Sequence, residues 1–178
     1  QIPGFVTPGI GGAIFVSSED GSFNSLIQNT AFTGNSTDNL ASAIAFKDAN
    51  NSGVHQVHNC SFSQNKKRNA LGANAKRVIE FYQANPLQPV EITNCILGND
   101  SIVYDPNFAL SYSLINDLLF SGNGNIISDN TKYIDSSNVY GQDGLPFTTD
   151  DGLHTKCGSS AINSGTSSIP LLPFDLSG

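Results

Sequence analysis

The sequence predicts an all-β protein built as a parallel β-solenoid, in which short strands from successive repeats stack on one another. Three observations lead to this prediction. The chain repeats itself at intervals of 30 and then 35 residues. Apolar residues within each repeat alternate with a period of two, which is typical of strands. Ser, Asn and Gly, which favour turns over helices, make up 59 of the 178 residues.

The repeat is clearest over the first hundred residues. Aligned copies lie near residues 11–35, 41–65 and 77–100, with a weaker fourth copy at 101–127. Within a copy, Ile44 and Phe46 should point inward, and so should Cys60 and Phe62. No copy is large enough to bury these side chains alone, so neighbouring copies must stack. We therefore predict a short solenoid of three to four coils over residues 1–127 and an irregular capping segment over 128–178.

An asparagine recurs at one position of each clear copy, at Asn29, Asn59 and Asn94. Each lies two residues after an apolar residue and just before an inward-facing pair, where the chain must bend between two strands. Asn tolerates the left-handed backbone conformation that a tight bend needs. Stacked Asn side chains can also hydrogen-bond to one another. The sequence thus predicts a ladder of asparagines along the stack.

Composition excludes two classes of partner. A net charge of −7 argues against binding to nucleic acid, which needs a positive face for the phosphates. No apolar run approaches the ~20 residues that span a bilayer as a helix. A length of 178 residues fits one domain with a real core.

Several runs resemble the turns of right-handed parallel β-helix proteins of the pectin-lyase-like superfamily, namely GGAIF, NTAFTGN, NCSFSQN and NCILGND. The tail, with GNGNI, GQDG, TDDGL and SAINSG, resembles the C-terminal segment of secreted bacterial proteins of the "choice-of-anchor" type. The resemblance implies a right-handed coil and a secreted or cell-surface location in a bacterium. Superfamily members include polysaccharide lyases, glycoside hydrolases, adhesins and binding modules, so the fold does not fix the activity.

Catalytic members of this superfamily usually have many more coils, so we expect the chain to be the C-terminal part of a longer protein. The end of a stack of strands leaves backbone groups that can pair with another strand. End-to-end association with missing coils, or with another chain, is therefore a candidate property.

Catalysis would require charged groups side by side on the outer face. Lyase members typically use calcium with a Lys or Arg, and hydrolases use two or three carboxylates. The expected outward positions hold no such set: Ala43, Ala45, Val78, Glu80, Glu91 and Thr93. We favour a non-catalytic module that binds polysaccharide or serves in adhesion. The alternative is a lyase or hydrolase fragment acting on acidic polysaccharide.

Five of the eight Lys and Arg residues fall in one predicted loop, residues 66–77. The candidate ligand-binding residues are Lys66, Lys67, Arg68, Lys76 and Arg77, with Tyr82 offering a ring on which a sugar could stack. A basic patch on an acidic protein would attract an acidic polysaccharide or a cell-surface glycan. The alternative reading is a solvated loop.

Three carboxylates lie within nine residues of the tail, at Asp143, Asp150 and Asp151. Calcium binds six to eight oxygens from carboxylates, carbonyls and water. These residues are therefore candidate ligands for a structural Ca²⁺ ion. A simple charged turn is the alternative.

The remaining metal-ligating residue types have simpler expected roles. Cys60 and Cys95 occupy the same position of successive copies, where side-by-side strands suit a relaxed disulfide poorly, so we expect free buried thiols. Cys157 has no evident partner. We expect His55 and His58 at the surface, at the edge of one turn, and not as a metal pair.

Overall fold

A computed structural model describes residues 12–18, 23–38, 41–48, 53–68, 77–81, 89–98, 108–116, 123–128, 131–145, 148 and 151–169. Within these ranges the chain forms strands and turns and no helix, which confirms the predicted all-β class. It follows that the described part of the chain contains no helix able to cross a membrane.

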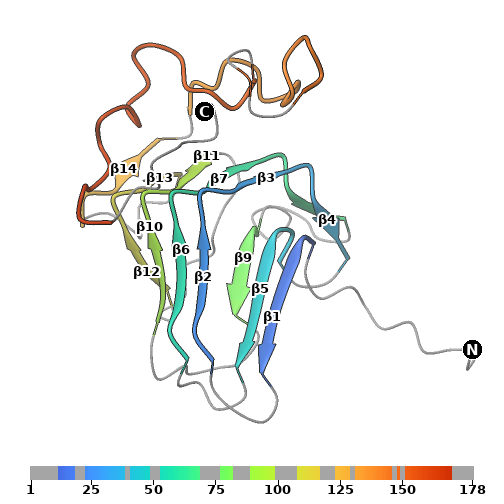
Figure 1. Cartoon of the computed structure of the whole chain (residues 1–178), viewed down its shortest axis with the longest axis vertical. Coiled ribbons are helices and arrows are strands. Elements are labelled where there is room, and N and C mark those ends of the chain that lie inside the picture. The colour runs from blue at the N-terminus through green and yellow to red at the C-terminus, as the bar shows by residue number, and fades with distance from the viewer. Residues whose placement is uncertain are drawn as a thin grey trace, which may run out of the picture.

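Parallel pairing joins the described strands into four sheets (Figure 1). Sheet A contains β1 (Ile14–Ser18), β5 (Ile44–Asp48) and β9 (Ile79–Phe81). Sheet B contains β2 (Ser25–Gln28), β6 (His55–His58), β10 (Val90–Thr93) and β12 (Phe108–Ser111). Sheet C contains β3 (Ala31–Thr33), β7 (Ser61–Ser63), β11 (Ile96–Gly98), β13 (Leu114–Ile115) and β14 (Ile126–Ile127). The short strands β4 (Ser36–Thr37) and β8 (Lys66–Lys67) form the fourth pair.

The pairing register reproduces the sequence repeat. Ile14 lies opposite Ile44, 30 residues later, and Ile44 lies opposite Ile79, 35 residues later. In sheet B, Val57 lies between Ile27 and Ile92 in the same way. Among the first three copies, sheets A, B and C therefore each take one strand from each copy. The weaker fourth copy contributes β12 and β13, which pair with β10 and β11.

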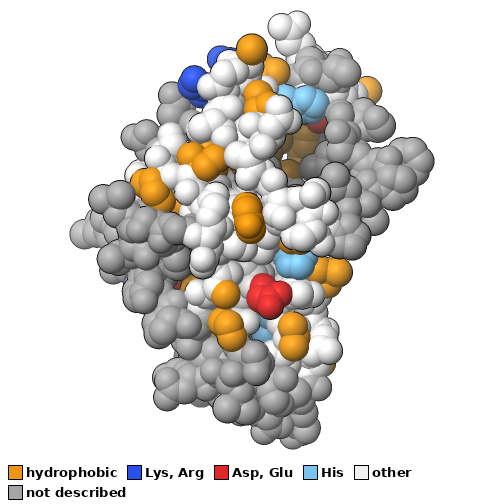
Figure 2. All heavy atoms as spheres, turned by 90° about the vertical axis from the view of Figure 1, so that its left-hand side faces the viewer, with side chains coloured by type: hydrophobic (Ala, Val, Ile, Leu, Met, Phe, Trp, Pro, Cys, Tyr) orange, Lys and Arg blue, Asp and Glu red, His pale blue; other side chains and the backbone are white. Residues whose placement is uncertain are grey.

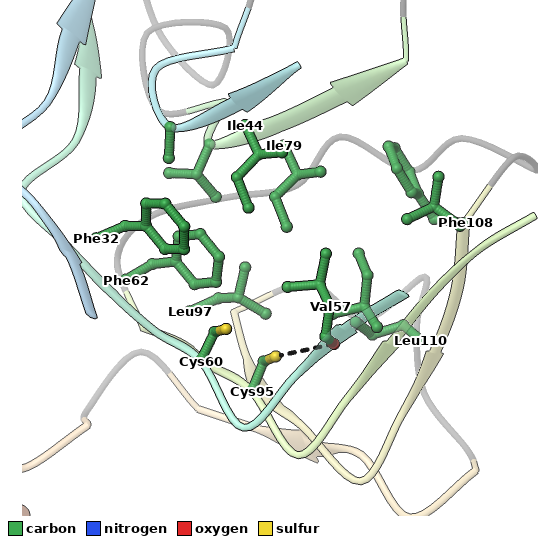
Figure 3. Close-up of a cluster of buried hydrophobic side chains, with 14 of the residues drawn as sticks. Phe32, Ile44, Val57, Cys60, Phe62, Ile79, Cys95, Leu97, Phe108 and Leu110 are labelled. Carbon is green, nitrogen blue, oxygen red and sulfur yellow. Dashed lines mark hydrogen bonds between the residues drawn. The ribbon is translucent and has the colours of Figure 1, made fainter. Parts of the chain in front are cut away.

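The core consists of side chains from equivalent positions of successive copies (Figure 3). Phe32 and Phe62 stack with ring centroids 5.1 Å apart and planes 10° apart. Ile44 and Phe46 are fully buried, as the alternation predicted. Fully burying an aliphatic or aromatic side chain contributes about 1.5–3 kcal/mol, so such columns hold the copies together.

The predicted inward and outward positions fail at the entry to sheet A. Ala43 and Val78 were expected to face outward, but both are buried in the core cluster. The N–H groups of Ala43 and Ile44 both donate to the carbonyl of Val78, at 3.1 and 2.8 Å. This pairing bends the backbone like a β-bulge, so that the consecutive residues Ala43 and Ile44 both face the core.

Two further positions expected to be exposed are also covered. Ala45 lies opposite Phe15 and Glu80 in neighbouring strands and is completely buried. Thr93 is 9% exposed. Alternation assigns a side chain to one face of a strand, but it does not tell whether other parts of the chain cover that face.

The three asparagines lie at the predicted bend, but only one bond of the predicted ladder forms, between Asn94 and Asn59. Asn59 Nδ2 is buried without a hydrogen-bond partner, so the ladder does not continue to Asn29. Asn29, Asn59 and Asn94 have φ values of 51°, 53° and 56°, in the left-handed region. The Asn94 Nδ2 group donates to Asn59 Oδ1 at 3.1 Å. Tyr112 takes the equivalent position in the fourth copy, with φ 49°. The bend thus has the same backbone conformation in each copy.

A second asparagine column follows β3 and β7. Asn35 Nδ2 donates to Asn65 Oδ1 at 2.9 Å, and Asn65 Nδ2 donates to the carbonyl of Phe32 at 2.9 Å. Asn65 is 3% exposed, so these bonds satisfy a polar group that would otherwise be costly to bury.

Residues 131–169 form turns together with an isolated antiparallel bridge between Tyr133 and Thr155. Figure 1 shows most of this segment along one side of the sheets, beyond sheet C. The segment is fixed to the strands through Asn94, whose Oδ1 accepts from the N–H of Thr166 at 2.8 Å and whose Nδ2 donates to the carbonyl of Thr166 at 2.9 Å.

Replacing Asn94 should separate the contribution of its side-chain hydrogen bonds from the cost of its left-handed backbone conformation. Asn94→Ala removes the side-chain bonds and places alanine in a left-handed conformation, so we expect the free energy of unfolding to fall by about 3 kcal/mol. Asn94→Gly loses the same bonds but tolerates the conformation, so its loss should be about 1 kcal/mol smaller. Urea denaturation measures both. Equal losses for the two variants would show that the left-handed backbone carries no strain at this position.

Candidate functional site

An open groove of about 680 Å³ lies on the outer face of sheet B. Outward side chains of β2, β6, β10 and β12 form its floor, and Tyr112, Asn123 and parts of the C-terminal segment form its wall. The described lining residues are Leu26, Gln28, Gln56, His58, Glu91, Thr93, Ala109, Leu110, Ser111, Tyr112, Asn123, Thr166, Ser168 and Ile169. Figure 2 looks onto this side of the molecule, where an acidic side chain and a histidine lie close together among uncharged groups.

The floor consists of two rows that run across the strands. The first row contains Leu26, Gln56, Glu91 and Ala109, and the second contains Gln28, His58, Thr93 and Ser111. Because neighbouring strands lie about 4.8 Å apart, each row presents a side chain at that interval. The register that stacks the core therefore also aligns polar groups on the outer face.

Hydrogen bonds connect neighbours within each row. Gln56 Nε2 donates to Glu91 Oε2 at 2.7 Å, and the hydroxyl groups of Thr93 and Ser111 lie 3.1 Å apart. Such cross-strand pairs contribute roughly 0.2–1 kcal/mol each and so favour this arrangement of the side chains. The floor is therefore a preformed set of amide, carboxylate and hydroxyl groups.

His58 lies in the second row and is 9% exposed. Burial lowers the pKa of His58 because it disfavours the charged imidazolium, and the nearby carboxylate of Glu91 opposes this shift. The ring is therefore mainly neutral at pH 7, where one nitrogen donates and the other accepts a hydrogen bond.

The predicted surface position of the histidines is wrong. His55 is 2% exposed and faces the core, where its Nδ1 lies 2.8 Å from Ser25 Oγ and its ring lies 5.1 Å from that of Phe46. The reason is the register, because His55 lies opposite Ser25 in the inward row that also contains Val57.

The wall of the groove is held in place by two features. Asn94 fixes the backbone of Thr166, as described above, and the hydroxyl groups of Thr166 and Ser168 lie 2.7 Å apart. The ring of Tyr112 packs over Gly124, where an added Cβ would lie 2.5 Å from the ring. Tyr112 nevertheless remains 44% exposed, so it offers an oriented aromatic surface to the groove.

The predicted basic patch lies elsewhere, and its charges are largely paired. Arg68 forms two bonds to Asp38, at 2.8 and 2.7 Å, and Glu80 binds Arg77 at 2.7 Å and Lys67 at 3.4 Å. Lys67 also belongs to strand β8 together with Lys66, so the expected loop 66–77 begins later than predicted. Lys66 is exposed. The other two predicted ligand-binding residues, Lys76 and Tyr82, lie outside the described residues.

Two of the predicted calcium ligands accept hydrogen bonds from nearby backbone N–H groups. Asp143 Oδ1 accepts from the N–H of Leu145 at 2.8 Å, and Asp151 Oδ2 accepts from the N–H of Thr148 at 3.1 Å. Asp150 lies outside the described residues. Within the described part of the chain, no group of three or more His, Cys, Asp or Glu side chains is placed to hold a metal ion.

The prediction of free, buried thiols at Cys60 and Cys95 is confirmed. Figure 3 shows the two side chains next to each other at the bend, with Cys95 Sγ donating to the carbonyl of Val57 at 3.5 Å. Burial raises the pKa of Cys95 well above its usual value, so this thiol stays protonated at neutral pH. Cys157 is exposed.

Sequence reasoning placed Glu91 and Thr93 on an outer face but missed the groove. Alternation in β6 would have added Gln56 and His58 to the same face. Nothing in the sequence indicates that Thr166, which lies 72 residues after Asn94, forms part of the wall of the groove.

No family model, curated protein or solved structure is significantly similar to the chain. The groove is therefore the main basis for a functional proposal.

The different environments of the thiols predict different reactivity. In the native protein at pH 8 we expect the thiol reagent DTNB to modify Cys157 alone, because burial protects Cys60 and Cys95. All three thiols should react in guanidinium chloride. A Cys157→Ser variant should show almost no reaction when folded, and rapid reaction of that folded variant would contradict the buried placement of the other two.

Proposed function

We propose that this chain is a secreted or cell-surface module, folded as a short right-handed parallel β-helix, that binds a polysaccharide without cleaving it. The groove on the outer face of sheet B carries the proposal. It combines two rows of outward side chains, six of whose eight members can form hydrogen bonds, with an exposed aromatic ring. Pockets that bind small ligands characteristically combine apolar surface with a few well-placed polar groups.

The coil follows from the pairing pattern. Each described sheet is parallel and takes strands from successive copies. Connections between parallel strands of one sheet are right-handed in nearly all proteins, which supports the right-handed form. The resemblance of the tail to secreted bacterial proteins supports the extracellular location.

The groove suits a sugar polymer in both chemistry and shape. Its amide, imidazole, carboxylate and hydroxyl groups supply both donors and acceptors for the hydroxyl groups of a glycan, and the Tyr112 ring can stack on a sugar face. Because the rows run across the strands, an extended chain would meet one side chain of each row at each successive strand.

Binding without cleavage is favoured by the charges present. Hydrolysis of a glycosidic bond ordinarily needs two carboxyl groups on either side of the bond. Glu91 is the one Asp or Glu among the described lining residues. No Lys or Arg is among the described lining residues, and Arg68 and Arg77 of the predicted basic patch are paired with carboxylates outside the groove. A role in adhesion follows where the bound glycan belongs to a cell surface.

Blocking the groove should weaken binding. Ala109 lies on the floor in a strand and is exposed, so Ala109→Trp should fill the groove and weaken glycan binding at least about tenfold, equivalent to about 1.4 kcal/mol. Ala31→Trp makes the same change at an exposed strand position in sheet C and should leave binding unchanged. A glycan array followed by calorimetry on the best ligand provides the measurement. Absence of binding to every neutral, acidic and amino-sugar glycan tested would overturn the proposal.

We also propose that a Ca²⁺ ion stabilises the segment of residues 143–151, called the acidic loop, with Asp143, Asp150 and Asp151 as ligands. Excess CaCl₂ should then raise the melting temperature relative to EGTA, because a ligand that binds only the folded state stabilises it. Asp151→Asn should reduce this rise, whereas Asp38→Asn, which changes a carboxylate outside the loop, should not. Identical melting temperatures of the unaltered protein in CaCl₂ and EGTA would exclude a stabilising calcium site.

A further inference from the structure

We propose that the groove on sheet B prefers a glycan with free amino groups over a neutral or an acidic glycan, and that Glu91 sets this preference. This inference rests on the proposed binding function and specifies the class of ligand. It differs from the expectation drawn from the basic residues of the sequence, which pointed to an acidic polysaccharide.

The charges of the groove are the first argument. Among the described lining residues, Glu91 is the one Asp, Glu, Lys or Arg, and the neighbouring His58 is held mainly neutral by burial. Figure 2 shows that the Lys and Arg side chains visible from this side lie near the top of the view, away from the acidic side chain. The chain as a whole carries a charge of −7, which also repels a polyanion.

The position of Glu91 is the second argument. It lies within the first row of the floor, opposite Gln56 on one side and Ala109 on the other. Gln56 Nε2 donates to Glu91 Oε2 at 2.7 Å, which orients the carboxylate. Ala109 is small, so it leaves room for a ligand group beside the carboxylate.

The chemistry of the possible ligands then decides between them. A carboxylate has two oxygens with about four acceptor sites, so one bond from Gln56 leaves capacity for further donors. The ammonium group of an amino sugar has three N–H donors and the opposite charge, which gives a charge-assisted hydrogen bond. An N-acetylated sugar offers one uncharged N–H, and a uronic acid brings a like charge that Glu91 would repel.

The test compares three oligomers of equal length by calorimetry on the full chain at low ionic strength. These are glucosamine, N-acetylglucosamine and galacturonate oligomers. Glu91 is solvent-exposed, and ion pairs at such sites contribute at most about 1 kcal/mol. We therefore expect the glucosamine oligomer to bind about fivefold more tightly than the N-acetylglucosamine oligomer, and the galacturonate oligomer to bind most weakly.

Glu91→Gln removes the charge and keeps the size of the side chain. It should lower the affinity for the glucosamine oligomer about fivefold and leave that for the N-acetylglucosamine oligomer unchanged. Glu80→Gln is the matched control, because Glu80 forms its ion pairs outside the groove, and this variant should keep the preference. High salt should also weaken the preference in the unaltered protein, since salt screens an exposed charge pair.

Three outcomes would overturn the inference. Equal binding of the glucosamine and N-acetylglucosamine oligomers, or tightest binding of galacturonate, would show that Glu91 does not select the ligand, while the proposed binding function would stand. An undiminished preference in Glu91→Gln would have the same meaning. If none of the three oligomers, and no other glycan, bound to the unaltered chain, the proposed function itself would fail.

Discussion

The parallel hydrogen-bond ladder between equivalent strands of neighbouring copies is the interaction on which the rest of the structure depends. The strands are two to five residues long, too short to be stable alone. The ladder fixes Ile14 opposite Ile44 and Ile44 opposite Ile79. A slip of one residue would send each buried side chain to the outer face, so core packing and register support each other.

This register explains why like residues stack on like. Phe32 lies on Phe62, Asn94 bonds to Asn59, and Cys60 lies beside Cys95. Stacked rings bury apolar area, and the amides of Asn94 and Asn35 each donate to the equivalent asparagine of a neighbouring copy. The repeated residues are therefore a direct consequence of repeated environments.

The same register produces the groove. Gln56 and Glu91 meet on the outer face because Val57 and Ile92 meet inside. Asn94 links the two halves of the site, because it belongs to the ladder and also binds the backbone of Thr166 in the wall. A change in the stacking of the copies would thus alter both the floor and the position of the wall.

Much of the fold could be predicted from the sequence, since repeats and alternation reflect local geometry. The positions of the copies, the asparagine bends and the buried thiols followed from residue spacing alone. The exceptions are informative. Ala43 turns inward because two N–H groups share the carbonyl of Val78, and alternation within one copy does not describe such hydrogen bonds between copies. His55, by contrast, lies two residues before the buried Val57, so alternation within β6 does place it on the core face, and the surface prediction overlooked this.

The candidate site was less accessible to sequence reasoning. Clustering in the sequence drew attention to Lys66, Lys67 and Arg68, but ion pairing with distant carboxylates decides how much charge remains to attract a ligand. By itself, the sequence determined the class of fold and the positions that stack, because those depend on residue periodicity. Only the tertiary structure decided which outer face is hollowed and which charge lies in it, because the groove joins β2, β6, β10 and β12 to Thr166, and folding alone brings these segments together.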